Sequence, residues 1–198
     1  MSKWKKIVSK IISRVLDPVV EIPVALGLAI WFAVSGGLRW RFLVMIMIVD
    51  AVLPFVFMLI ALAKGQISNW DIRNRKERIP LYLFTLFVHG VGILLADWMG
   101  KSDLARILLV FWLVAAVFAI VTTRWKISLH TGVNTVLIMF ANVIYHWQYW
   151  WLLGLIPLVA WARVYDKHHT WRQAAVGAVL GGVVTYVGMA YLGMMLVV

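Results

Sequence analysis

Residues 104–122 read LARILLVFWLVAAVFAIVT, an apolar stretch whose single charge is Arg106. A transmembrane helix needs about 20 mainly apolar residues to cross the hydrocarbon core of a bilayer. Comparable stretches, some of them shorter, cover most of the chain and lie at residues 18–36, 42–63, 80–98, 132–147, 149–162 and 174–196. The pattern predicts an all-α fold, a polytopic transmembrane helical bundle with six to seven spans.

The composition indicates the same class of protein. Of the 198 residues, 64% are hydrophobic and 14% are charged, whereas soluble domains are roughly half apolar. The formal net charge is +11, but the basic residues flank apolar stretches, so membrane lipids with anionic headgroups are the expected partner and nucleic acid is not. Cysteine is absent, which excludes disulfides, thiolate metal ligands and cysteine nucleophiles.

The N-terminal segment, residues 1–16, has a different pattern from the spans. Its apolar residues recur at helical spacing from Trp4 to Leu16, and lysines and serines occupy the opposite face. This pattern is typical of an amphipathic helix that lies on the membrane surface. We therefore expect two parts, an interfacial helix at 1–16 and a transmembrane domain at 17–198.

Three polar segments interrupt the apolar stretches, at residues 64–79, 123–131 and 163–173. Two predicted spans separate each neighbouring pair, so all three segments are expected on the same membrane face as the N-terminus. Most of the 19 lysines and arginines belong to this face. The tendency of basic loops to stay inside predicts that it is the cytoplasmic face of an integral, multi-pass membrane protein.

The segment 163–173 carries the strongest chemical signal. Arg163 precedes His169 by six positions, and Gln173 follows His169 by four. If the helix begins at residue 169, the His169 and Gln173 side chains share one face, and the amide oxygen can accept an imidazole N–H. A neutral, oriented histidine is a competent nucleophile toward phosphorus. By contrast, Lys167, His168 and Arg172 are expected to contact lipid headgroups.

The other two segments supply groups that suit a phosphate. Ser128 and His130 stand at the start of a predicted span, where unpaired helix N–H groups favour an anion and where His130 can protonate a leaving oxygen. Arg75 and Arg78 lie just before the span that contains Pro80, and guanidinium groups can contact phosphate in a bidentate manner.

Together these residues resemble the type 2 phosphatidic acid phosphatase superfamily. Its signature is Lys, six residues, Arg-Pro; then Pro-Ser-Gly-His; then Ser-Arg, five residues, His, three residues, Asp. The matching positions in this chain are Arg78, Ser128, His130, Arg163 and His169, and the departures are Ile79 before Pro80, Asp71 for Lys, Ile127 for Pro, Leu129 for Gly, Ala162 for Ser and Gln173 for Asp. Arg75 or Lys76 can take the place of the missing lysine.

The resemblance implies a lipid phosphatase without a metal or another cofactor. His169 would be the nucleophile that forms a phosphohistidine, His130 the general acid and Gln173 the group that orients His169. The groups implied to hold phosphate are Arg163, Arg78, Arg75 and Ser128. The implied substrate is a lipid phosphate or diphosphate, polyprenyl or phosphatidate-like. Gln173 lacks the charge that would stabilise an imidazolium, so slower chemistry is expected unless Asp166 or Asp71 supplies it.

Two alternatives remain open from the sequence. One is a catalytically silent, lipid-binding membrane protein of the same fold, which the variant motifs favour. The other is a membrane prenyltransferase, because residues 69–75 loosely match an Asp- and Arg-rich diphosphate loop, although the chain has only eight acidic residues and lacks a second such loop. The oligomeric state is left open.

Two further patterns concern packing. Asp50 and His89 lie inside predicted spans, and we expect them to pair with each other or with backbone that Pro54 leaves unbonded. In the last span, Gly177, Gly181 and neighbouring small residues recur every four positions, which predicts close helix packing within the chain.

Overall fold

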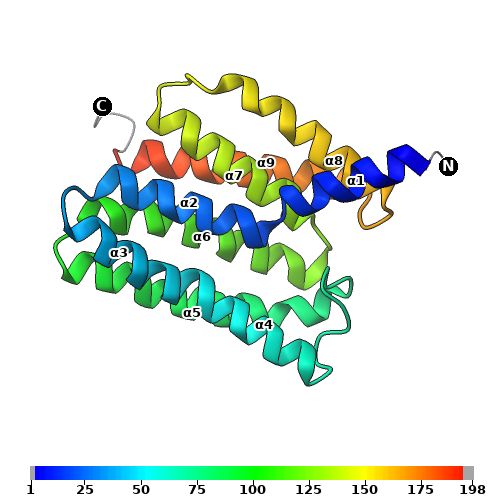
Figure 1. Cartoon of the computed structure of the whole chain (residues 1–198), viewed down its shortest axis with the longest axis horizontal. Coiled ribbons are helices and arrows are strands. Elements are labelled where there is room, and N and C mark those ends of the chain that lie inside the picture. The colour runs from blue at the N-terminus through cyan, green and yellow to red at the C-terminus, as the bar shows by residue number, and fades with distance from the viewer. Residues whose placement is uncertain (1–2, 194–198) are drawn as a thin grey trace. The chain divides into compact units, whose positions relative to one another are not determined.

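The computed structural model describes residues 3–193, and every regular element in this range is a helix (Figure 1). The helices are α1 (Lys3–Val15), α2 (Pro18–Ala33), α3 (Leu38–Met47), the π-helix η1 (Ile48–Val52), α4 (Leu53–Ala63), α5 (Arg75–Trp98), α6 (Ser102–Arg124), α7 (Leu129–Ile144), the 3-10 helix η2 (Trp150–Gly154), α8 (Leu155–Tyr165) and α9 (Trp171–Tyr191). The prediction of an all-α fold is confirmed. Residues 1–2 of the predicted interfacial helix and 194–196 of the last predicted span lie outside the described residues.

Within residues 3–193, five helical runs are long and apolar enough to cross a membrane. They are Lys3–Ala33, Leu38–Ala63, Arg75–Trp98, Ser102–Arg124 and Trp171–Tyr191. This is consistent with the integral membrane protein that the composition predicts. Five is fewer than the predicted six to seven, because Leu129–Ile144 and Trp150–Tyr165 are shorter apolar helices. A crossing by these two segments stays a prediction.

The chain forms two compact units. Unit 1 comprises residues 1–24 and 127–198, and unit 2 comprises residues 25–126. Unit 1 contains α1, the start of α2, α7, η2, α8 and α9, and unit 2 contains the rest of α2 and the elements from α3 to α6. The predicted division after residue 16 concerns placement relative to a membrane, which contacts within the chain do not test.

In unit 1, α1 packs against α8 (Figure 1), and small polar residues of α1 lie on the packed face. Ser9 and Ser13 are buried, and the Ser9 hydroxyl donates to Asp166 Oδ1 at 2.7 Å. The apolar side chains of Trp4 and Ile11 are exposed instead. The serines therefore form the intramolecular face of α1, and its apolar residues are left on the surface.

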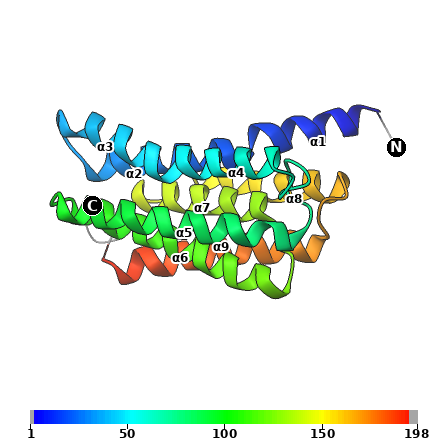
Figure 2. The ribbon, with the colours of Figure 1, turned by 90° about the horizontal axis from the view of Figure 1, so that it is seen from below.

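Helices α7 and α9 lie side by side in unit 1, and glycine permits their close approach (Figures 1 and 2). A Cβ atom on Gly177 would lie 2.5 Å from the Ser128 carbonyl oxygen, and one on Gly181 would lie 2.6 Å from the Gly132 carbonyl oxygen. Both distances are too short for a real contact, so these positions require glycine. The prediction that the small residues of the last span pack within the chain is confirmed.

We predict that Gly181→Ala lowers the midpoint of thermal unfolding in detergent, whereas Gly182→Ala leaves it nearly unchanged. The added methyl group at 181 meets a backbone oxygen that cannot move alone, and overpacking costs about 1–3 kcal/mol. At 182 the nearest atom is the Thr135 methyl carbon at 3.2 Å, which can shift. Equal midpoints for the two variants would contradict this account of the contact between α7 and α9.

In unit 2, α5 and α6 pack together (Figure 2). A buried contact between a histidine and an aspartate joins α5 to η1. His89 Nδ1 lies 3.3 Å from Asp50 Oδ2, and the other ring nitrogen of His89 lies 2.9 Å from the Leu108 carbonyl oxygen. Pro54 has no N–H for the Asp50 carbonyl, and the helix is π-helical over Ile48–Val52 just before it. The predicted pairing of Asp50 with His89 is confirmed.

Gly92 provides the room for this carboxylate, which gives a matched pair of substitutions on α5. A Cβ at Gly92 would lie 2.8 Å from Asp50 Oδ1, whereas one at Gly90 would have its nearest neighbour at 3.8 Å, an ordinary contact. We expect Gly92→Ala to destabilise the protein by about 1–3 kcal/mol and Gly90→Ala to be neutral or slightly stabilising. Thermal unfolding in detergent measures the difference, and a Gly92→Ala protein as stable as Gly90→Ala would refute the close contact.

Candidate functional site

The spacing between Arg163 and His169 results from the way α8 ends. Lys167 adopts a positive φ of 57°, its N–H donates to the Val164 carbonyl at 3.0 Å, and the His168 N–H donates to the Arg163 carbonyl at 3.0 Å. These two bonds define a Schellman motif, which reverses the chain in a few residues. The His169 N–H also donates to the Arg163 carbonyl, at 3.3 Å, so the turn holds the predicted nucleophile beside the last turn of α8.

The following helix corrects one expectation. Helix α9 begins at Trp171 and Thr170 is its N-cap, so His169 precedes the helix and does not share a helical face with Gln173. A capping box is the reason, because Thr170 Oγ1 accepts from the Gln173 N–H at 3.3 Å and Gln173 Oε1 accepts from the Thr170 N–H at 3.1 Å.

Gln173 nevertheless reaches His169. His169 Nδ1 lies 3.3 Å from Gln173 Oε1, the same oxygen that accepts from the Thr170 N–H. An amide oxygen can only accept, so the contact is a hydrogen bond when His169 Nδ1 bears a proton. The contact that the sequence predicts is therefore present. It forms because the Gln173 side chain, in the first turn of α9, extends past the N-cap to His169.

Burial separates the predicted site residues from the basic residues around them. The exposed fraction is 3% for Arg163 and 7% for His169, whereas Lys167 and Arg172 are exposed. The position of Lys167 and Arg172 is compatible with contact to lipid headgroups. Arg163 and His169 are internal polar groups, which need a structural or chemical reason to be there.

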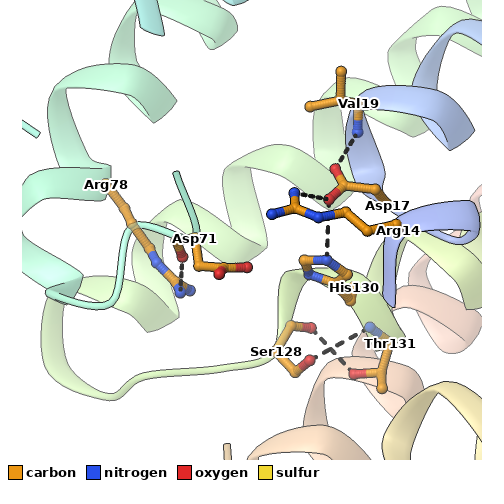
Figure 3. A network of polar contacts seen from close by, with 8 residues as sticks. All are labelled: Arg14, Asp17, Val19, Asp71, Arg78, Ser128, His130 and Thr131. Atoms are coloured by element: carbon orange, nitrogen blue, oxygen red, sulfur yellow. Dashed lines mark hydrogen bonds and ion pairs between the residues drawn. The ribbon is translucent and has the colours of Figure 1, made fainter. Parts of the chain in front are cut away.

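The start of α7 joins the second predicted segment to the third. Ser128 is the N-cap of α7, and its Oγ accepts from the Thr131 N–H at 3.4 Å (Figure 3). The Ser128 N–H donates to the Gln173 carbonyl at 3.2 Å, and Thr131 Oγ1 donates to the Ala174 carbonyl at 2.9 Å. The N-terminal turns of α7 and α9 are therefore in direct contact within unit 1.

His130, in the first turn of α7, has a partner that the sequence did not reveal. Its Nε2 lies 3.5 Å from Asp17 Oδ2, and the two side chains are each 10% exposed (Figure 3). Asp17 stands between α1 and α2, and its Oδ1 accepts from the Val19 N–H at 3.0 Å. The pair Asp17-Pro18 is a recognisable start signal for a helix, with Asp as N-cap and Pro at the first helical position. That signal locates the carboxylate but not its contact with α7.

The same two helices meet again one turn further along. Glu21 is four residues after Asp17, Asn134 is four residues after His130, and the Asn134 amide donates to Glu21 Oε1 at 2.6 Å. Both side chains are buried. The charged or polar residues of α2 and α7 thus face each other in two successive pairs within unit 1.

The two predicted phosphate ligands of the first segment lie in unit 2, where both contact backbone carbonyls. Arg78 is buried, and its Nε donates to the Ile72 carbonyl at 2.8 Å (Figure 3 shows its contact with the Asp71 carbonyl). The Arg75 guanidinium donates to the Thr122 and Thr123 carbonyls at the end of α6. These arginines stabilise a turn and a helix end, and their role toward phosphate stays a prediction.

Of the two aspartates expected to replace the missing charge beside His169, Asp166 has a carboxylate contact with α1, and Asp71 has a backbone contact within unit 2. Asp166 Oδ1 accepts from Ser9, and the Asp71 carbonyl contacts Arg78. In the part of the chain that the structure describes, no three His, Asp or Glu side chains form a group that could hold a metal ion.

Comparisons with family models, with curated proteins and with solved structures gave no match. A functional assignment therefore rests on the residues and their geometry.

We predict that Gln173→Ala and Thr170→Ser separate the orientation of His169 from the capping of α9. Gln173→Ala removes the acceptor of the His169 Nδ1–H and one half of the capping box, so the His169 ring loses its fixed tautomer and stability falls by about 0.5–2 kcal/mol. Thr170→Ser keeps an N-cap hydroxyl. Nitrogen NMR of labelled histidine should show mixed tautomers of His169 in the first variant only, and an unchanged spectrum in Gln173→Ala would contradict the assignment.

Proposed function

We propose that this chain is a membrane-embedded lipid phosphatase that acts through a phosphohistidine. The observation that carries the proposal is a continuous set of contacts within unit 1. The Arg163 carbonyl accepts from the His169 N–H, the His169 ring donates to Gln173, and the Gln173 carbonyl accepts from the Ser128 N–H, two residues before His130. Two separate polar segments are thereby joined, and both contain the residue types that phosphoryl transfer to histidine requires.

In the first step, His169 Nε2 attacks phosphorus. The Nδ1–H donates to Gln173 Oε1, which leaves the Nε2 lone pair for a new P–N bond while the bond from phosphorus to the lipid oxygen breaks. Arg163 and the Ser128 hydroxyl hold the phosphoryl oxygens, because a guanidinium offers paired donors and the serine can donate its hydroxyl hydrogen while it accepts from Thr131.

His130 acts as the general acid and then as the general base of the proposed reaction. As an imidazolium it gives a proton to the departing lipid oxygen, and as a neutral imidazole it then takes one from the water that attacks phosphorus. The P–N bond breaks in this second step and inorganic phosphate is released. Each cycle returns both histidines to their starting protonation states.

The substrate in this proposal is a lipid with a terminal phosphate or diphosphate, polyprenyl or phosphatidate-like. A small headgroup suits side chains that lie at helix ends, and the apolar helices provide surroundings for the lipid tails.

We also propose that α7 and the segment 150–165 complete six to seven spans, although 16 helical residues reach only about 24 Å of a hydrocarbon core of about 30 Å. The abundance of basic residues near the N-terminus supports a cytoplasmic site, with α1 on the membrane surface.

A catalytically silent lipid-binding protein is the second candidate, and one observation favours it. Gln173 closes the capping box of α9 and Ser128 caps α7, so both residues have structural roles that need no catalysis. A prenyltransferase would instead need magnesium, and chelator-sensitive activity would support that alternative.

We expect the purified protein to release phosphate from lipid phosphates in detergent without added metal. His169→Ala should lower the rate on the order of 10³-fold or more, since it removes the nucleophile. His168→Ala should retain most of the rate, because His168 takes no part in the proposed chemistry. Both variants change the same loop, and equal unfolding midpoints in detergent would show that a difference in rate reports chemistry and not folding.

Two outcomes would refute the proposal that this chain is a lipid phosphatase. One is that none of a panel of polyprenyl phosphates, polyprenyl diphosphates and phosphatidates loses phosphate. The other is that His169→Ala and His168→Ala release phosphate equally fast. Binding of lipid phosphates without turnover would identify the silent alternative.

A further inference from the structure

We infer that Asp17 is a positioning residue for His130, and that it assigns the proton-transfer role to Nδ1 of the His130 ring. The inference rests on the proposed function, because it concerns the acid of that reaction. It adds a residue from the junction of α1 and α2 that no motif in the polar segments contains. Asp17 acts through His130 and has no assigned contact with substrate.

The position of the Asp17 carboxylate is fixed by contacts that do not involve His130. Its Oδ1 accepts from the Val19 N–H at 3.0 Å, as an N-cap of α2 does, and Pro18 restricts the backbone at the first helical position. With Oδ1 held in this way, Oδ2 is directed at His130 Nε2, 3.5 Å away (Figure 3). A carboxylate bound at one oxygen and aimed with the other sets the orientation of the ring it faces.

The helices that carry this pair are fixed by a second contact. Glu21 and Asn134, one helical turn further along α2 and α7, are joined at 2.6 Å, so α2 cannot slide along α7 without breaking a buried hydrogen bond. Arg14 Nη1 also lies 3.9 Å from Asp17 Oδ2, and the Arg14 side chain is 64% exposed. The Asp17 carboxylate is thus a buried group that contacts the His130 ring from the start of α2.

The proton balance follows from this orientation. In the imidazolium form, Nε2–H faces the Asp17 carboxylate, and Nδ1–H is given to the lipid oxygen as its bond to phosphorus breaks. The neutral ring that remains keeps its proton on Nε2, held by Asp17, and has its lone pair on Nδ1. That lone pair takes the proton of the attacking water in the second step, which restores the imidazolium.

Asp17→Asn is the decisive variant, because asparagine is as good an N-cap as aspartate and the fold should survive. Its amide oxygen stays with the Val19 N–H, so its NH₂ group faces His130 Nε2 and favours the wrong tautomer. We expect kcat to fall roughly 10- to 100-fold with little change in KM, and the alkaline limb of the pH–kcat profile to move to lower pH because the stabilising anion is gone.

Glu21→Gln is the matched control. It removes a buried acid one turn along the same helix while its amide oxygen still accepts from Asn134. We expect its kcat and its pH profile to resemble those of the wild type. Equal effects of the two variants, or an Asp17→Asn protein with unchanged kcat and pH profile, would overturn the inference.

Nitrogen NMR of labelled histidine tests the same pair without activity. The His130 signals, identified by their loss in His130→Gln, should report protonated Nε2 in the wild type and in Glu21→Gln, and unprotonated Nε2 in Asp17→Asn. If the protein has no phosphatase activity but shows this tautomer change, the proposed function fails while the pairing stands. If the tautomer is unchanged, the pairing fails whatever the activity.

Discussion

The contact between the N-terminal turns of α7 and α9 is the constraint on which the candidate site depends. The first N–H groups of any helix lack intrahelical partners. Here Ser128 caps α7, Thr170 caps α9, and the Ser128 N–H donates to the Gln173 carbonyl. Glycine at 177 lets the two backbones approach closely enough for this bond. Because both helix starts are fixed to each other, the histidines beside them acquire defined surroundings.

Burial of polar groups in an apolar bundle follows one rule in both units, since a buried charge is costly unless it is paired. Asp50 faces His89 in unit 2, and Asp17 faces His130 in unit 1. The two pairs have the same composition but different surroundings. His89 also binds a backbone carbonyl and is explained as a structural pair, whereas His130 stands at a helix start beside a capping serine. Position, and not residue type, distinguishes the candidate acid.

Much of the fold was predictable from hydrophobic patterning, because long apolar stretches permit few alternatives to helices. The number of spans was less certain, since the helix at Leu129–Ile144 is too short for length to decide. The contact of His169 with Gln173 was predicted, but its cause was not, because a threonine cap and a helix that starts at Trp171 are decided by the turn after α8. Asp17 was missed because its contact with His130 joins residues 113 positions apart, and no local pattern encodes that.

The central claim is that His169 accepts a phosphoryl group, and mass spectrometry after an alkaline quench tests it most directly. The protein would be mixed with a lipid phosphate, quenched during turnover and digested. The account predicts a peptide heavier by one phosphoryl group, with the modification on the His169 imidazole. Phosphate release without any adduct on His169, or an adduct on a different residue, would contradict it.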